Sequence, residues 1–370
     1  MNKSRVLLLV LAAFTIAFFS ACGKYKKPAK GDFGRILVVM DSTKLDSQTA
    51  QALRESFGGT IETLPAPEPQ FHLHFTDLKR NSDLDWIKTR KNVIVVATLD
   101  DETNVGSYMR SLLSDELRQR VETNQNFAFP LKDHWATNQW VLLLSGTDDA
   151  TLAENIREAS GSLIDNVLDI EYVRWHKQLY RRKEQVKLAD SLWDKHGWKI
   201  RIQADYKKHI DSLNMVTFRR SAPDNQRWFW IWWKDNVNDI SYLDADWINA
   251  TRDSLLQTYY KGARNDANLA FRGVKGDSYI ETEYRRPVIT STKIMNGKYT
   301  LETKGTWRMT QDFMGGPFVN YAVYDENQRR LYLMEFGQFA PKYNKRRFVR
   351  QFEATARTFA TDSSFTISAR

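Results

Sequence analysis

The chain has 370 residues, of which 42% are hydrophobic and 13% are aromatic. This composition excludes an intrinsically disordered protein, and the length exceeds the roughly 250–300 residues that one hydrophobic core usually serves, so we expect two domains. The formal charge of +9 comes from 54 Lys and Arg against 45 Asp and Glu. Because the basic residues are scattered among acidic ones, we expect a solvated, mildly basic surface and no nucleic-acid partner.

The N-terminus has the three parts of a secretory signal. A short basic start precedes residues 6–19, which contain no charged residue, and small residues follow at Ser20 and Ala21. The apolar run is shorter than the roughly 20 residues that a spanning helix needs. The sequence therefore predicts a cleaved signal peptide over residues 1–21.

Cys22 is the one cysteine of the sequence, so an internal disulfide is excluded. It follows two small residues, as the lipidated cysteine of a bacterial lipoprotein does, and we predict that it is acylated and anchors the chain to a membrane. Phe19 departs from the aliphatic residue usual three positions before such a cysteine. The alternative is an ordinary signal peptide with an incidental cysteine. Residues 22–34 have no apolar periodicity, which is typical of a tether.

The next segment alternates predicted strands and helices. An apolar run at 36–40 reads as a strand, and 47–57 has helical spacing that ends at a pair of glycines. Further strands are expected at 71–75, 92–99 and 140–144, and helices at 105–124 and at 148–166, the last continuing with interruptions toward residue 196. Strands that alternate with helices favour an α/β domain, here residues 35–196.

The element pattern changes near Gly197, which we expect to end a helix. Strands then cluster, with helices expected at 244–262 and 344–359, and this grouping predicts an α+β domain with a mainly antiparallel sheet over 197–370. Asn296-Gly297 is a strong hairpin signal, because a type I′ turn needs positive φ at both central residues. The expected strands are 198–202, 215–218, 227–233, 279–285, 288–295, 299–309, 318–324 and 330–339.

The second half resembles a known family through a series of short motifs along the chain. They are Trp198-Lys199-Ile200, Asp205-Tyr206, the aromatic strand at Trp228, the hairpin 296–299, Gly305-Thr306-Trp307, residues 313–318, and Phe339-Ala340-Pro341 before a basic helix. With the lipobox cysteine, they resemble an uncharacterised lipoprotein family of Bacteroidetes-type bacteria, the domain of unknown function numbered four-eight-three-seven. We expect the resemblance to cover most of the chain after the signal. It implies a lipoprotein and no particular activity.

The resemblance also bears on localisation. Surface lipoproteins of such bacteria are expected to carry an acidic signal after the lipidated cysteine, whereas residues 23–27 are basic here, and the residue after Cys22 is not Asp. We therefore expect an outer-membrane lipoprotein that faces the periplasm, with lysines of the tether against anionic head groups. The partners expected are the membrane, through Cys22, and an envelope protein.

Motifs that carry catalysis or bind cofactors are not found in the sequence. It contains no convincing G-x-S-x-G, S-x-x-K, H-E-x-x-H, G-x-G-x-x-G or P-loop setting, so we assign no catalytic residue and no cofactor. His72 and His74 share one strand face, but two imidazoles are only half of a metal site, and we assign no metal. The basic runs 181–183 and 345–347 are interpreted as solvated helix faces or tethers.

One strand is a candidate ligand surface. Trp228, Trp230 and Trp232 share a face of the run 227–233, where they offer stacking planes to a sugar or peptide, but an interior strand would have the same pattern. The other speculative residues are Met314, Gly315 and Gly316, since paired glycines permit either a simple turn or close approach of a ligand.

These observations favour a non-enzymatic envelope lipoprotein that acts as an interaction or assembly module. The first alternative is a periplasmic lipoprotein that binds a peptide or sugar in an aromatic cleft between the domains. The second is an enzyme with an unrecognised site. A polar, aromatic cavity would favour the first alternative, and a cluster of ionisable groups with displaced pKa values the second.

Overall fold

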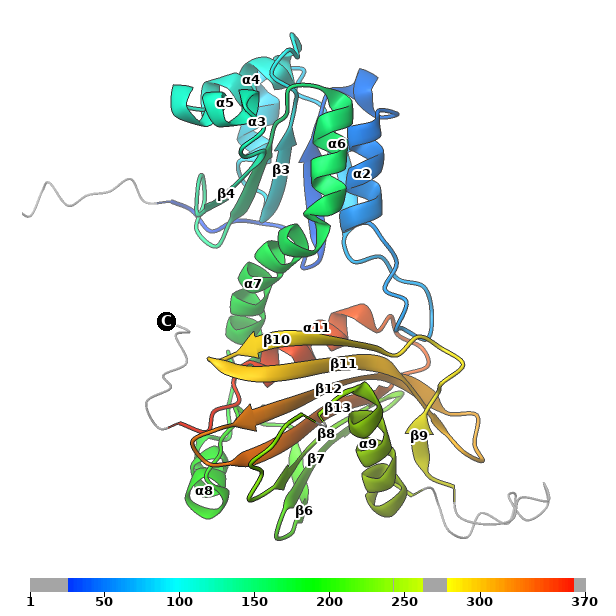
Figure 1. Cartoon of the computed structure of the whole chain (residues 1–370). Coiled ribbons are helices and arrows are strands. Elements are labelled where there is room, and N and C mark those ends of the chain that lie inside the picture. The colour runs from blue at the N-terminus through cyan, green and yellow to red at the C-terminus, as the bar shows by residue number, and fades with distance from the viewer. Residues whose placement is uncertain (1–25, 242, 262–277, 363–370) are drawn as a thin grey trace, which may run out of the picture. The chain divides into compact units, whose positions relative to one another are not determined.

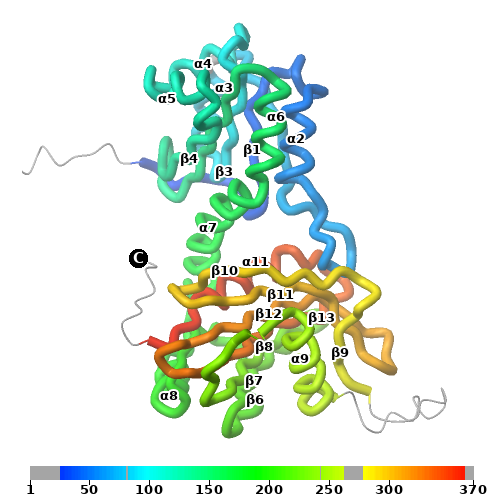
Figure 2. Tube along the Cα trace, in the orientation of Figure 1, coloured from blue at the N-terminus to red at the C-terminus, as the bar shows by residue number. Residues whose placement is uncertain are grey.

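The computed structural model describes residues 26–241, 243–261 and 278–362 (Figures 1 and 2). The expected signal peptide and Cys22 lie outside these residues. The described residues form two compact units: an N-terminal unit of 26–52 with 73–158, and a C-terminal unit of 53–72 with the described residues of 159–362. In the described part of the chain, no helix has both the length and the apolar character needed to cross a bilayer.

The N-terminal unit is built on a mixed sheet. The strand order is β2-β1-β3-β5-β4, in which β1 and β5 run parallel to β3, while β4 runs antiparallel to β5. β3 and β5 are buried along their whole length, and apart from Asn92 their residues are apolar, as expected for strands covered on both faces. The strands are β1 (Arg35–Val39), β2 (His72–Thr76), β3 (Asn92–Val96), β4 (Ala128–Lys132) and β5 (Trp140–Leu144).

Helices cover both faces of this sheet. Those on one face bury Ile87, Val105 and Met109 against alternate residues of β1, β3 and β5. The expected helix over 105–124 is two helices, because Ser114 accepts a hydrogen bond from the backbone of Leu117 and caps a new start. The helices are α2 (Gln48–Phe57), α3 (Asn81–Ile87), α4 (Asn104–Leu112), α5 (Asp115–Glu122) and α6 (Asp149–Glu158), with a short 3-10 turn, η1 (Ser42–Lys44).

The C-terminal unit contains a long antiparallel sheet, whose strands β10 to β13 run across the view in Figure 1. Its order is β10-β11-β12-β13-β8-β7-β6, and β9 pairs with β11. The predicted fold class, an α/β domain followed by an α+β domain with a mainly antiparallel sheet, is confirmed. The strands are β6 (Lys207–Asp211), β7 (Met215–Ala222), β8 (Asn225–Lys234), β9 (Ile280–Thr282), β10 (Ile289–Met295), β11 (Lys298–Met309), β12 (Gly315–Asp325) and β13 (Arg330–Phe339).

Hydrophobic cores lie on both faces of this sheet. On one face, Phe352 of α11 joins Phe229 of β8 and other apolar residues; on the opposite face, Leu256 of α9 joins Trp230. α7 packs on α11. The helices are α7 (Ser160–Leu179), α8 (Val186–His196), α9 (Ala245–Tyr259) and α11 (Arg346–Ala356), so the expected continuation of 148–166 toward residue 196 is a succession of separate helices.

Local turn predictions hold where glycine or asparagine needs a positive φ. Asn296 and Gly297 have φ values of 53° and 77° between the paired ends of β10 and β11. Gly197, with φ 74°, ends α8 and donates its N–H to Trp193. The expected strand at 198–202 is not a sheet strand, because only an isolated bridge joins Lys199 to Ala360.

A segment from the first half of the chain is built into the C-terminal unit. Glu68 accepts hydrogen bonds from the backbone N–H groups of Lys345 and Arg346, at 2.5 and 3.1 Å, where α11 begins. A carboxylate at this position satisfies free N–H groups and complements the positive end of the helix dipole. Gln70 accepts a further hydrogen bond from Arg350 at 2.5 Å, so the segment is fixed to α11.

Candidate functional site

The aromatic strand proposed as a ligand surface lies inside the C-terminal unit. Trp228 and Trp230 are 7% and 0% exposed and belong to the core that α9 covers, and the half-buried Trp232 packs against the same core. Phe229 and Ile231 fill the core on the opposite face. The strand is thus buried on both faces, as expected for an interior strand of a sheet.

The glycine pair lies at the start of β12. A Cβ on Gly316 would come within 1.9 Å of the carbonyl oxygen of Gln338, so the close approach that needs glycine is made by the neighbouring strand β13. Gly315 pairs with Arg308 of β11. Met314 packs against the core that contains Trp230. The speculative ligand residues are therefore sheet and core residues.

The two histidines of β2 are both exposed. Among the residues that the structure describes, no group of three or more His, Cys, Asp or Glu side chains is arranged to hold a metal ion. Cys22, the predicted lipidation site, lies outside the described residues.

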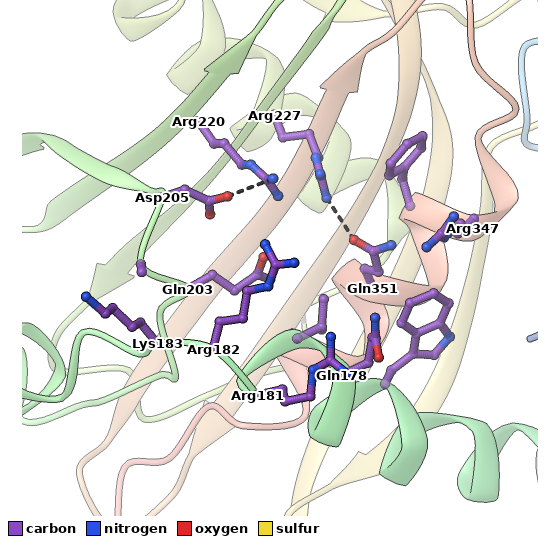
Figure 3. Close-up of a pocket in the computed structure, with 14 residues that line it drawn as sticks. Gln178, Arg181, Arg182, Lys183, Gln203, Asp205, Arg220, Arg227, Arg347 and Gln351 are labelled. Atoms are coloured by element: carbon purple, nitrogen blue, oxygen red, sulfur yellow. Dashed lines mark hydrogen bonds and ion pairs between the residues drawn. The ribbon is translucent and has the colours of Figure 1, made fainter.

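The C-terminal unit contains a strongly basic cavity of about 640 Å³, drawn in Figure 3. Among the described lining residues, six carry a positive charge and Asp205 alone carries a negative one. The lining residues come from the end of α7, the connection to α8, the segment before β6, the hairpin β7–β8 and the start of α11. The cationic residues are Arg181, Arg182, Lys183, Arg220, Arg227 and Arg347.

Two of these arginines are direct neighbours across the sheet. Arg220 of β7 and Arg227 of β8 are register partners, since they stand at equal distances from the turn that joins the strands. Like charges at directly opposed positions destabilise a sheet. Asp205 offsets part of the repulsion by pairing with Arg220 at 2.7 Å. Arg227 has no such ion pair with a carboxylate in the part of the chain that the structure describes.

Arg227 is the most deeply buried of the cations that line the cavity. The residue is only 6% exposed, and its Nη1 donates to the neutral amide oxygen of Gln351 at 2.8 Å. Its Nε is buried and has no hydrogen-bond partner among the described residues. Burial lowers the pKa of this guanidinium, and the positive charges of Arg220 and Arg347 lower it further. Tyr206 and Asp205 raise the pKa but do not outweigh these effects. A bound anion would relieve this energetic cost.

The remaining walls are aromatic and cationic. The guanidinium carbon of Arg227 lies 4.8 Å from the ring centre of Phe348, and that of Arg347 lies 5.8 Å from the ring of Trp175. In Figure 3 the exposed Arg182 points toward Arg220 and Arg227, whereas Lys183 points away from them. The exposed Arg182 and the buried Arg227 therefore line one cavity from different parts of the chain.

This cavity was not predicted from the sequence. The runs 181–183 and 345–347 were interpreted as solvated helix faces or tethers, and the structure brings Arg181, Arg182, Lys183 and Arg347 to one cavity. A signal for the two central residues exists in the sequence. Arg220 and Arg227 lie symmetrically about a Pro-Asp turn, and that symmetry places them on one face of a hairpin.

A second charged cluster is fully buried. Arg252 of α9 and Glu335 of β13 are 0% and 1% exposed, and Arg252 donates to the carboxylate at 2.5 and 3.1 Å. Arg252 also donates to Thr282 and to the carboxylate of Asp253, and Asn320 donates to Glu335. Burial raises the pKa of Glu335, against the attraction of Arg252. Because its charges are satisfied internally, the pair joins α9 to the sheet.

Family comparisons divide the chain in two. Residues 185–358 match a domain of unknown function, DUF4837, and residues 29–180 match a second domain of unknown function, DUF8532. The predicted resemblance to an uncharacterised family is confirmed. We expected it to cover most of the chain after the signal, but the DUF4837 match covers only the second half. No curated protein matches the chain. Trp175 falls in the DUF8532 match, and Arg220, Arg227 and Arg347 fall in the DUF4837 match.

Proposed function

We propose that this chain, in which a DUF4837 domain follows a DUF8532 domain, is an envelope lipoprotein that binds a ligand carrying a phosphate or carboxylate group. The observation that carries the proposal is Arg227, a buried guanidinium that donates to a neutral amide and, among the described residues, is bonded to no carboxylate. Isolated buried charges are costly, and native proteins pair them with counter-charges or ligands.

The cavity has the chemistry that such a ligand requires. Planar guanidinium groups bind phosphate and carboxylate oxygens through two parallel hydrogen bonds, which makes arginine the preferred residue for these anions. A volume of about 640 Å³ suits a small molecule. Phe348 and Trp175 add apolar walls, so the ligand we expect has an apolar or ring portion beside its anionic group.

Binding is favoured over catalysis by the residues that line the cavity. Its described lining includes three glutamines and one carboxylate but no His, Ser, Cys or Tyr side chain. Asp205 is engaged with Arg220. A nucleophile held beside a general base, which covalent catalysis needs, is thus not found among these residues.

The compartment is part of the proposal. Acylation of Cys22 would hold the protein on the outer membrane, where it faces the periplasm and works with an envelope partner. An acidic segment of that partner presents the same carboxylate chemistry as a small ligand. In cells, Cys22→Ala should leave the protein unprocessed or release it from the membrane fraction. Unchanged membrane fractionation of a correctly processed variant would contradict the anchor.

Calorimetric titration of the purified mature chain tests the cavity. The probes are inorganic pyrophosphate, citrate and a hexa-aspartate peptide, each at low and high salt. We expect Arg227→Met to weaken binding of the preferred probe by about 10- to 100-fold, because a hydrogen bond to a charged group contributes roughly 1.5–3 kcal/mol. Arg220→Gln is a second test should Arg227→Met fold poorly.

The matched control is Arg219→Gln. Arg219 precedes Arg220 on β7, lies on the opposite face over the ring of Tyr260, and does not line the cavity. Its loss removes the same charge from the same strand, so binding should change less than about twofold, as expected for a screened distant charge. Equal losses for Arg219→Gln and Arg220→Gln, or no measurable binding of any probe by the wild type, would contradict the proposal.

A further inference from the structure

The N-terminal unit carries an exposed tryptophan on a basic surface. Trp86, in the last turn of α3, is 41% exposed. The guanidinium carbon of Arg90 lies 4.4 Å from the centre of its ring, and the ring of His74 meets it at 6.5 Å edge to face. Tryptophan with its apolar face and polar N–H is enriched at the interface between membrane and water.

A cavity of about 370 Å³ adjoins this tryptophan. Four cations line it and, among its described lining residues, Asp32 is the one carboxylate, at 3.8 Å from Arg35 with both side chains largely exposed. The Nε of Arg90 is buried and has no hydrogen-bond partner in the part of the chain that the structure describes. The cations are Lys30, Arg35, Arg90 and Lys91.

The segment that leads to the predicted anchor is bonded to this same edge. The backbone N–H of Lys30 donates to the carbonyl of Thr89 at 2.6 Å, and that of Ala29 to Thr137 at 2.9 Å. Thr137 in turn donates to the carbonyl of Lys27 at 3.0 Å. The expected tether is therefore docked from residue 27 onward. Only five residue steps separate it from Cys22, and these span at most about 18 Å.

We propose that the surface formed by Lys30, Arg35, Trp86, Arg90 and Lys91 docks on an anionic phospholipid membrane beside the lipid anchor. The inference rests on the proposed acylation of Cys22, which would hold this surface against head groups. Cations contact the phosphates and Trp86 enters the interface. The test must distinguish binding to a membrane from binding of a soluble ligand that carries the same phosphate group.

The test uses the mature chain with Cys22→Ser, which carries no lipid. It is co-sedimented with vesicles of phosphatidylcholine and with vesicles that contain phosphatidylglycerol. We expect about tenfold stronger partitioning onto the anionic vesicles at low salt, and most of this gain lost in high salt, as for other surface attractions between basic residues and lipid. Because no acyl chain is present, the result is independent of whether Cys22 is acylated in cells.

Two pairs of variants locate the contact. Arg90→Glu should lower partitioning onto anionic vesicles at least about fivefold, while Arg120→Glu, an equal charge reversal on α5, should have less than half that effect. Trp86→Ala should weaken binding, whereas Tyr343→Ala, which removes another exposed aromatic ring, should not. Thermal unfolding confirms that each variant is folded.

Three results would overturn the proposal. The first is equal partitioning onto neutral and anionic vesicles, and the second is an equal effect of Arg90→Glu and Arg120→Glu. The third is saturable binding of glycerol 1-phosphate without any vesicle binding, which would identify a soluble ligand. Failure of Cys22→Ala to change fractionation in cells would instead contradict the anchor, so the two failures are distinguishable.

Discussion

Asp211 gathers three donors at the end of β6. Its carboxylate accepts from Lys195 at 2.7 Å, from Lys208 at 2.6 Å and from His196 at 2.9 Å. Burial raises the pKa of this carboxyl group, but the three donors outweigh burial and hold its pKa well below the usual 3.8. A lowered pKa in the folded state means that the carboxylate stabilises the fold above the unfolded pKa and loses this effect as pH falls.

We predict that Asp211→Asn lowers the melting temperature at neutral pH and that the difference from wild type shrinks as pH falls from about 5 to about 2. Thermal unfolding followed by circular dichroism across this range measures the difference. Asp190→Asn, a substitution at an exposed position of α8, removes the same charge without these partners and should give a nearly constant offset. A constant offset for Asp211→Asn as well would show that its donors do not shift its pKa.

Single residues were predictable from sequence where backbone geometry alone decides. Asn296, Gly297 and Gly197 have the positive φ values that their turns demand. The role of Arg227 was not predictable in this way. Its position in a run of aromatic residues indicates only burial, whereas its bond to a neutral amide depends on which side chain of α11 lies beside it.

At the scale of elements, Glu68 shows how a loop stabilises a distant helix. Glu68→Gln should lower the free energy of unfolding by about 1 kcal/mol, because the neutral amide still accepts a hydrogen bond but loses its attraction to the N-terminus of α11. The midpoint of urea unfolding measures this loss. Glu62→Gln, at an exposed position of the same segment, should change stability by less than about 0.5 kcal/mol. Equal effects of the two substitutions would exclude a capping role.

Elements with strong periodicity were predicted well, and the others were missed for identifiable reasons. β3 and β5 occupy apolar runs that the sequence marks plainly. β4 is an edge strand that contains Pro130, so its sequence does not resemble a strand. The break between α4 and α5 had a visible signal in Ser114, followed by two acidic residues, as at many helix starts.

At the scale of the whole molecule, the fold class followed from the sequence, but the extent of each compact unit did not. The sequence pattern changes at Gly197, whereas α7, α8 and the segment Leu53–His72 all belong to the C-terminal unit. Contacts within that unit explain why. Tyr172 of α7 donates to the buried Glu353 of α11 at 2.8 Å, and Leu192 of α8 joins the core beneath the sheet. Periodicity does not report such contacts between distant segments.

The expected boundary at residues 196–197 can be tested by comparing two fragments, 159–370 and 197–370. We predict that 197–370 is less stable by more than about 3 kcal/mol, because it loses the buried side chains of α7 and α8 and leaves Glu353 without the hydroxyl donor of Tyr172. Total stabilities are only about 5–15 kcal/mol, so this fragment should show poor amide dispersion in NMR spectra. Adding a peptide of residues 53–72 should raise the melting temperature of 159–370, since Glu68 would again reach α11. Equal dispersion and equal urea midpoints for the two fragments would show that residues 197–370 form an independent core and that the long helices only lie against it.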